Sequence, residues 1–343
     1  MTATDDAAQL AETLAAKLAT PTHDTDDKTG REQSLAQGAA GVALLHIERA
    51  LAGVGSWSTA HAWVSTATAR GISAADDTSL YLGAPALSFI LHAAEADHVR
   101  RYDRALSTVD SGVAALAHRR VDAAVARAQC GEATTFVEYD LFSGLAGIGQ
   151  LLLRHAPGTD ALGRILDYLV RLTTPRADGL PGWWVSRDPD STLPTPGGHA
   201  NHGVAHGISG VLALLGTALR HGVTVDGHRD AIATISTHLD AWRHDEEPGS
   251  WWPEWITRGE QRTGRSRQRG PFRPSWCYGT PGIARAQQIA AIATGDAARQ
   301  RMAEHAIAAC LFDAGQLSGI TDHGLCHAGP GCTRPPGEPP RTR

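Results

Sequence analysis

Two cysteines and a histidine in the C-terminal third of the sequence have side chains that could together hold a metal ion. Cys277 lies in the run Trp276–Gly279, and the dipeptide Cys326-His327 follows much later in the chain. Two thiolates and one imidazole leave the fourth position of a tetrahedral zinc ion open, which is the arrangement of catalytic zinc. From spacing alone, each cysteine is equally a buried small apolar residue, because no Cys-X-X-Cys pair favours a metal. The zinc interpretation requires a fold that brings two distant loops together.

A Gly-X-X-Gly turn followed by an apolar run recurs along the sequence. This pattern indicates the elements that must position these residues. Full copies lie at 38–41, 144–147, 207–210 and 279–282, and degenerate copies lie at 82–86 and 327–331. Intervals of about 45 to 72 residues fit one helix pair per repeat. Repeats of this kind bury their apolar faces only by packing on their neighbours. The sequence therefore predicts a solenoid or a closed ring of helix pairs.

The fold class predicted from composition and periodicity is all-α. The chain has 343 residues, 42% of them hydrophobic, and almost no runs of alternating β-branched residues. Helices are expected at 5–18, 103–128, 161–172 and 297–312. The domain organisation expected is an N-terminal helix and linker at 1–33, one repeat-built domain at 34–331, and a disordered tail rich in Pro and Arg at 332–343.

Charge and hydropathy argue against a nucleic-acid-binding protein and against a membrane-spanning one. The formal net charge of −5 gives no electrostatic footprint for nucleic acid. The one basic stretch, Arg262–Arg273, fits a solvated loop or the border of a substrate cleft, since it directly precedes Cys277. No stretch of 18 apolar residues is present, and the N-terminus is acidic where a signal peptide would be basic. We therefore expect a cytoplasmic protein with no transmembrane segment.

Five segments in order resemble the signature motifs of the lanthipeptide cyclase (LanC-like) family. They lie at 34–38, 139–147, 201–208, 273–279 and 324–327, and the resemblance runs from about Ser34 to Gly331. It implies an α/α toroid whose inner helices begin at the Gly-rich hairpins. It also implies one central zinc ion bound by Cys277, Cys326 and His327.

The resemblance further implies a reaction and its partners. Family members add a cysteine thiol of a dehydrated precursor peptide to dehydroalanine or dehydrobutyrine, which forms a thioether ring. A thiolate is the nucleophile, and coordination to zinc deprotonates a thiol. A separate lanthipeptide dehydratase would supply the substrate, because the first cyclase motif already begins at Ser34.

Three further positions match the family's active-site motifs. His206 corresponds to its acid/base histidine, Asp140 to the acidic partner, and Arg273 to a fixed positive charge for the enolate oxygen. Judged without the resemblance, the three are a structural histidine, a helix N-cap and a surface charge. Trp276 and Tyr278 are expected to line the substrate cleft beside Cys277, whereas Trp183 and Trp184 are expected to serve packing.

The sequence departs from the family at its end. Only 328–343 follow the Cys-His pair, and their Pro and Gly content excludes an inner helix, so the last helix pair is expected to be missing. The apolar residues Val42, Leu44 and Leu45 would then lose their covering. Two alternatives to the cyclase remain open, a LanC-like enzyme that adds glutathione or another thiol and a non-catalytic peptide-binding scaffold. A glycosidase ranks last, because it needs paired carboxylates.

Overall fold

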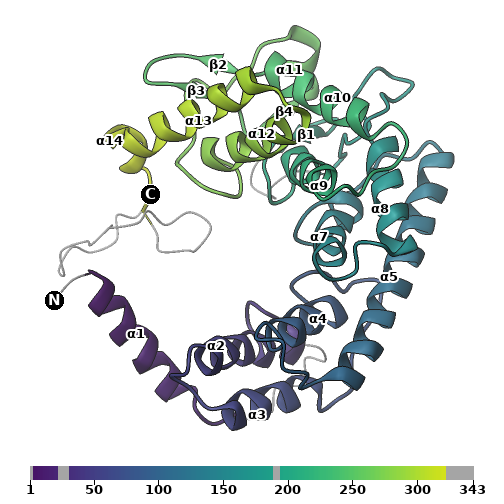
Figure 1. Ribbon diagram of the computed structural model, residues 1–343. Coiled ribbons are helices and arrows are strands. Elements are labelled where there is room, and N and C mark those ends of the chain that lie inside the picture. The colour runs from purple at the N-terminus through teal and green to yellow at the C-terminus, as the bar shows by residue number, and fades with distance from the viewer. Residues whose placement is uncertain (1–2, 22–30, 188–193, 322–343) are drawn as a thin grey trace. The chain divides into compact units, whose positions relative to one another are not determined.

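The computed structural model describes residues 3–21, 31–187 and 194–321. Its described elements are helices with four very short strands, as the all-α prediction requires (Figure 1). The chain folds as two compact units. Unit 1 comprises Met1–Leu172 and Val223–Asp226, and unit 2 comprises Thr173–Gly222 and Gly227–Arg343. The sequence-based division at 33 and 331 stays a prediction.

Unit 1 is built from helix pairs. Its elements are α1 (Ala3–Lys17), the 3-10 helix η1 (Arg31–Gln33), α2 (Ala39–Leu51), α3 (Trp57–Thr68), α4 (Ala84–Ala93), α5 (Asp103–Gln129), α6 (Phe136–Tyr139), α7 (Leu145–His155) and α8 (Asp160–Arg171). The helices that follow Gly-rich turns pack in the order α2, α4, α7, and each also packs on the helix after it. This is the arrangement of stacked helix-pair repeats.

Unit 2 repeats the pattern and adds short strands. Its elements are β1 (His199–Asn201), α9 (Ile208–Arg220), α10 (His228–Ala241), β2 (His244–Asp245), β3 (Ser250–Trp251), β4 (Trp255–Thr257), α11 (Arg258–Thr263), α12 (Thr280–Thr294), α13 (Ala297–Phe312) and α14 (Ala314–Leu317). Helices α9 and α12 lie side by side, and they pack on α10 and α13, respectively (Figure 1). Strand β1 pairs antiparallel with β4, and β2 with β3.

The predicted helices are confirmed with small shifts of their ends. The segments expected at 5–18, 103–128, 161–172 and 297–312 are α1, α5, α8 and α13. Each full Gly-X-X-Gly turn starts a helix, namely α2, α7, α9 and α12, and the degenerate copy at Gly83 starts α4. The second degenerate copy, at 327–331, lies outside the described residues.

The first glycine of each full turn is the N-cap of its helix. Gly38, Gly144, Gly207 and Gly279 all have extended backbones with ψ of −178°, −173°, −176° and 173°. In the first, second and fourth turns, the glycine three residues later contacts the backbone of the preceding turn. A Cβ on Gly147 would lie 2.1 Å from the Leu141 carbonyl oxygen, and one on Gly282 would lie 1.9 Å from that of Trp276. The turns therefore require glycine because backbone packs directly on backbone.

A polar side chain closes three of these turns, four residues before the N-cap glycine. Asp140 Oδ1 accepts hydrogen bonds from the amides of Ser143 (2.5 Å) and Gly144 (2.7 Å). Ser275 Oγ accepts from the amides of Tyr278 (3.3 Å) and Gly279 (2.8 Å). In the first turn Ser34 Oγ accepts from the amides of residues 36 and 37. Asp140, which is fully buried, thus has a structural part in its own turn.

The turn at Asp140 is also held by a buried arginine of α5. Arg120 donates hydrogen bonds to the carbonyl oxygens of Thr78 (3.1 Å), Ser143 (2.7 Å) and Val137. Burial lowers the pKa of Arg120, and the negative charge of Asp140 opposes this shift. The guanidinium ties three segments of unit 1 together and balances the buried carboxylate.

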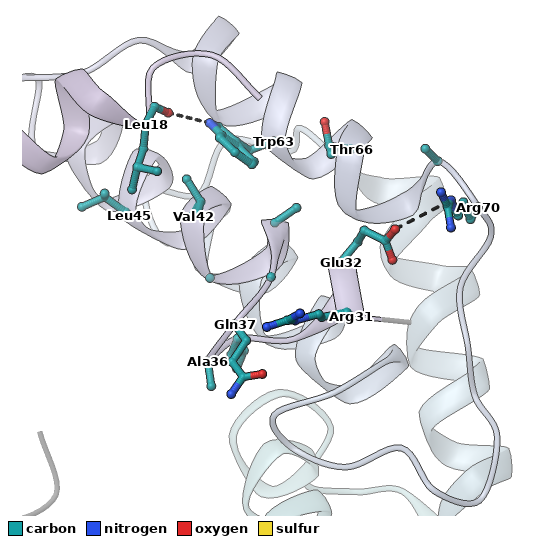
Figure 2. A pocket seen from close by; sticks show the side chains of 15 residues that line it. Leu18, Arg31, Glu32, Ala36, Gln37, Val42, Leu45, Trp63, Thr66 and Arg70 are labelled. Carbon is teal, nitrogen blue, oxygen red and sulfur yellow. Dashed lines mark hydrogen bonds and ion pairs between the residues drawn. The ribbon is translucent and has the colours of Figure 1, made fainter. Parts of the chain in front are cut away.

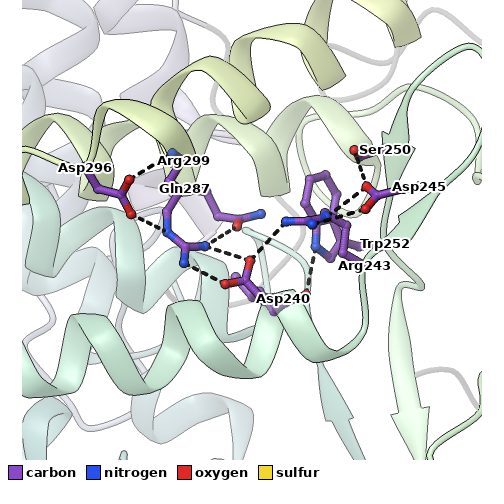
Figure 3. A network of polar contacts seen from close by, with 9 residues as sticks. Asp240, Arg243, Asp245, Ser250, Trp252, Gln287, Asp296 and Arg299 are labelled. Atoms are coloured by element: carbon purple, nitrogen blue, oxygen red, sulfur yellow. Dashed lines mark hydrogen bonds and ion pairs between the residues drawn. The ribbon is translucent and has the colours of Figure 1, made fainter.

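The helix pairs of unit 2 are joined by an ionic network (Figure 3). Arg299 of α13 binds both carboxylate oxygens of Asp240 at 2.8 and 2.6 Å, and it donates to Gln287 of α12 at 3.2 Å. The same Asp240 accepts from Arg243, whose guanidinium also reaches Asp245. Arg299 also pairs with Asp296, so the network links α10, α12 and α13. The side chains of Asp240, Arg243 and Arg299 are at most about one-third exposed, whereas those of Asp245 and Asp296 are more exposed.

Unit 1 contains a hollow of about 430 Å³ beside the first Gly-rich turn (Figure 2). Leu18, Val42, Leu45 and Trp63 supply apolar lining, and Trp63 Nε1 donates to the Leu18 carbonyl oxygen at 2.8 Å. Val42, Leu44 and Leu45, for which we expected a lost covering, are half-buried. None of the predicted site residues that the structure describes lines this hollow.

A pair of glycine substitutions tests the backbone contacts. Gly147→Ala is expected to lower the free energy of unfolding by about 2–3 kcal/mol, because its Cβ meets a fixed carbonyl oxygen. Gly163 of α8 has no atom within 4 Å of the same added Cβ. Gly163→Ala should therefore stabilise by about 0.5–1 kcal/mol. Chemical denaturation of both variants measures the difference, and equal stabilities would contradict the close approach.

Two substitutions at Asp140 separate its acceptor oxygen from its charge. Asp140→Ala removes the acceptor of two amides and should cost about 1–3 kcal/mol of stability. Asp140→Asn keeps a carbonyl oxygen at the same place and is expected to cost about half as much or less, through its weaker attraction to Arg120. Denaturant melts of the two proteins check this order. Equal losses would mean that the charge, rather than the turn closure, stabilises this region.

Candidate active site in unit 2

The third and fourth Gly-rich turns are joined directly through their backbones. The Cys277 carbonyl oxygen accepts hydrogen bonds from the amides of Val204 (2.8 Å) and Ala205 (3.2 Å). A Cβ on Gly203 would lie 2.5 Å from the same oxygen, so this approach requires glycine. The contact brings the segment 201–207 beside the segment 275–279. His206 and Cys277, which are 71 positions apart in the sequence, therefore lie on adjoining turns.

The side chains predicted for the site are half-buried or exposed at this junction. Cys277, His206 and Tyr278 are all half-buried. The ring centroids of His206 and Tyr278 are 6.2 Å apart with an interplanar angle of 38°. Trp276 is 38% exposed. The structure thus brings the segments of His206, Cys277 and Tyr278 together, with the indole of Trp276 next in sequence to Cys277.

A second histidine of the same motif lies behind this surface. His202 is fully buried, with Nδ1 at 2.9 Å from the Pro253 carbonyl oxygen and Nε2 at 3.0 Å from Nε2 of His238. Burial lowers the pKa of His202 to about 4 and that of His238 well below its usual value. Trp183 packs edge-on against His238 at 5.0 Å, which agrees with its predicted packing role. These imidazoles are neutral at pH 7 and support the turn.

Sequence reasoning missed one acidic residue of this region, Glu254. Its side chain is 7% exposed, in the loop between β3 and β4, and its carbonyl oxygen accepts from the His202 amide at 2.8 Å. Burial raises the pKa of Glu254 to about 7, and the positive charge of Arg273 opposes the shift. A carboxyl within the aromatic run 251–255 was the available signal, because a charged residue among Trp residues is unusual in a core. Perturbed carboxyls of this kind gather at functional sites.

The remaining predicted residues fall elsewhere. Arg273 is half-buried at the start of the fourth turn, and a Cβ added to Gly319 would lie 3.3 Å from its Cβ. Asp140 belongs to unit 1, where its carboxylate closes the second turn. Cys326 and His327 lie outside the described residues. Among the residues that are described, no group of three His, Cys, Asp or Glu side chains could hold a metal ion.

In the described part of the chain, no helix has the length and apolar character needed to span a bilayer.

The sequence was compared with known protein families and known proteins. The family model for lanthionine synthetase C-like proteins matches residues 30–329. The nisin biosynthesis protein NisC of Lactococcus lactis subsp. lactis is 25% identical over 213 residues, which make up 60% of this chain. The match spans about half of that relative's length, namely 49%.

A solved structure shows the same fold. Nisin cyclase superposes with a TM-score of 0.75 over 94% of this chain and 78% of its own, at 19% sequence identity. This match confirms the predicted fold class, the all-α α/α toroid. Because the family model covers most of the sequence, the chain belongs to the lanthionine synthetase C-like family.

Proposed function

We propose that the protein is a zinc-dependent cyclase that forms lanthionine and methyllanthionine rings in a dehydrated precursor peptide. The observation that carries the proposal is the backbone junction of the third and fourth turns, which sets the His206 imidazole beside the Cys277 segment. Family membership supports the same reaction class. A separate dehydratase would supply the dehydroalanine and dehydrobutyrine residues of the substrate.

The donor set fits a zinc ion with one open position. The described residues offer one ligand, the half-buried thiol of Cys277, and no complete three-residue set. The other proposed ligands, Cys326 and His327, follow Gly319 by seven and eight residues. Gly319 itself lies beside Arg273, and seven residues can span up to about 25 Å. The chain length therefore allows Cys326 and His327 to reach Cys277, and such a zinc would keep the peptide thiol deprotonated near neutral pH.

The side chains of unit 2 match the proton and charge movements of the addition. As the peptide sulfur bonds to the β-carbon, the alkene electrons move toward the amide oxygen and form an enolate. Arg273 offers positive charge for that oxygen, and His206 offers a proton for the α-carbon. The thiol loses one proton and the α-carbon gains one, so the product is an isomer of the substrate. Tyr278 and Trp276 are proposed to line the path of the peptide.

The protonation state of Glu254 affects how much of the field of Arg273 reaches the enolate oxygen. A carboxylate beside a guanidinium would cancel its field, but burial favours the neutral acid at Glu254. Near pH 7 much of this carboxyl is protonated and leaves the Arg273 charge uncancelled by it. We therefore assign Glu254 as a positioning residue. For Asp140, the described contacts support the structural part in unit 1, and its acid/base part remains a proposal.

Metal content and ring formation test the central assignment. Chelator-washed protein is expected to keep about one zinc per chain, and Cys277→Ala should lose most of it, because a three-ligand site does not survive on two ligands. Cys130, an exposed cysteine of unit 1, provides the control, and Cys130→Ala should keep the metal.

The same preparations are then given a dehydrated, Cys-containing peptide. The product should have unchanged mass and no alkylatable thiol, and His206→Asn should reduce its formation by about 100-fold or more while zinc stays bound. Addition of external glutathione without ring closure would favour the alternative thiol-adding enzyme. Full zinc content in Cys277→Ala would refute the ligand assignment.

The raised pKa of Glu254 predicts a distinctive pH dependence of stability. Its folded-state pKa is about 7 and its ordinary value is 4.5, so the folded state binds more protons between these values. The free energy of unfolding then falls as pH rises from about 5 to 7. Glu254→Gln should remove this slope and gain up to about 3 kcal/mol relative to the parent at pH 8, but little at pH 5.

Comparing the variant with the parent at each pH isolates Glu254 from His202 and His238. Those histidines have the opposite effect: because their folded-state pKa values are lowered, they reduce the free energy of unfolding as pH falls. Denaturant melts at pH 5 and pH 8 provide the measurement. A stability difference that is independent of pH would show that this carboxyl is ionised in the folded protein.

A further inference from the structure

The third Gly-rich turn, which carries His206, is closed in a different way from the other full turns. In those turns the side-chain acceptor lies four residues before the N-cap glycine, whereas in the third turn that position is Gly203. A Cβ on Gly203 would lie 2.5 Å from the Cys277 carbonyl oxygen and 2.8 Å from Cδ1 of Tyr278. The junction of the third and fourth turns therefore excludes a side chain at the usual closing position.

Asn201 supplies the acceptor instead, from two residues earlier in the chain. Its Oδ1 accepts from the Gly203 amide at 2.8 Å, and a Cβ on Gly207 would lie 2.5 Å from the same oxygen. One side chain thus lies against both of the glycines between which His206 is found. Asn201 is fully buried and is the last residue of β1, which pairs with β4, so a strand ladder holds its backbone.

Four successive amides of this turn, those of residues 202–205, donate to acceptors on three different segments. The Glu254 carbonyl oxygen accepts from residue 202 at 2.8 Å, and the Cys277 carbonyl oxygen accepts from residues 204 and 205. These acceptors belong to the backbone, so no side-chain substitution removes them. Asn201 Oδ1 is the one acceptor of the four amides that belongs to a side chain. The path of the backbone up to His206 therefore depends on one replaceable group.

Only the oxygen of the Asn201 amide takes part in these contacts. Its Nδ2 is buried and makes no hydrogen bond with any residue that the structure describes. An aspartate in the same place would keep the acceptor and would lose no hydrogen bond that the amide donates. Its negative charge would lie beside the N-cap of α9, where a helix dipole favours it. An Asn-to-Asp exchange therefore preserves the part of the side chain that holds the turn.

We propose that Asn201 is a positioning residue for His206: its amide oxygen holds the third turn in the shape that sets the imidazole beside the fourth turn. This inference rests on the proposed function, since it concerns the proposed proton donor of the same site. A proton donor must lie within reach of the atom that it protonates, and a displacement of about 1 Å can lower a rate about 100-fold. Glycine at 203 allows the two turns to touch, and Asn201 restores the fixed geometry that this glycine alone would not give.

Two substitutions at Asn201 test the role of its oxygen. With a dehydrated, Cys-containing peptide, Asn201→Ala is expected to lower kcat about 10- to 100-fold and to change KM less than about twofold. Zinc content should stay at the parental level, because Ser275 closes the turn of Cys277 independently. Asn201→Asp should restore kcat to within about threefold of the parent. A folded Asn201→Asp variant as slow as Asn201→Ala, or loss of zinc from Asn201→Ala, would overturn the proposal.

Gln33 of unit 1 provides a control of the same chemical type. It is a buried amide whose Oε1 accepts from the Ser73 amide at 3.0 Å and whose Nε2 donates to the Gly71 carbonyl oxygen at 2.6 Å. Gln33→Ala should lower the denaturation midpoint at least as much as Asn201→Ala, because it breaks two hydrogen bonds. It should nevertheless change kcat less than about twofold. Equal losses of kcat in the two Ala variants would overturn the proposal, because any loss of stability would then account for them.

The NMR signal of the His206 ring tests the positioning without any ring formation. Protein that is isotope-labelled at histidine Cε1 is compared with its His206→Asn variant, which identifies the signal. Asn201→Ala should shift or broaden this signal, whereas Asn201→Asp and Gln33→Ala should leave it close to its parental position. An unchanged signal in Asn201→Ala would overturn the proposal even if the parent forms rings. A parent that forms no rings but shows these signal changes would refute the cyclase and retain Asn201 as the residue that positions His206.

Discussion

The close approach of one backbone to another, made possible by glycine, is the constraint on which the rest of this structure depends. In the turns that precede α2, α7 and α12, a glycine within the helix lies against the carbonyl oxygen of the residue six positions earlier. Any side chain there would push the turn away from its own helix. These tight turns therefore fix the residue at which each helix begins and allow the apolar faces of the helices to stack in pairs.

The same constraint makes the candidate active site. Gly203 lets the Cys277 carbonyl oxygen come within hydrogen-bond distance of two amides of another turn. Side chains that reach the surface from these turns, His206 and Tyr278 among them, inherit a fixed separation from rigid backbone rather than from flexible loops. Behind them, buried polar groups such as His202 and Asn201 complete the hydrogen bonds of the turn, and Asn201 Oδ1 accepts from the Gly203 amide at 2.8 Å.

Sequence reasoning predicted the helix starts, because glycine turns and 3.6-residue periodicity are local signals. That His206 and Cys277 belong to one site was expected only from the family resemblance. Sequence reasoning did not predict the burial of Glu254, which directly precedes β4, the strand that pairs with the distant strand β1. Asp140 shows a different difficulty. In the structure its carboxylate closes a turn, whereas the family resemblance implies an acid/base role for it. The spacing of the motif does not distinguish these two roles. The pairing of Cys277 with Cys326 and His327 remains a prediction from motif order.

The contact between His202 and His238 fixes where protons reside in this part of the molecule. A carbonyl oxygen only accepts, so the nitrogen of His202 that faces Pro253 must carry hydrogen, and its other nitrogen presents a lone pair. His238 must then carry its hydrogen on Nε2. Each imidazole is locked in a single tautomer, and adding a proton to His202 would set two N–H groups against each other across 3.0 Å. Of the two histidines in the third turn, His202 is thereby held neutral by its surroundings, and His206 is the one that we propose as a proton donor.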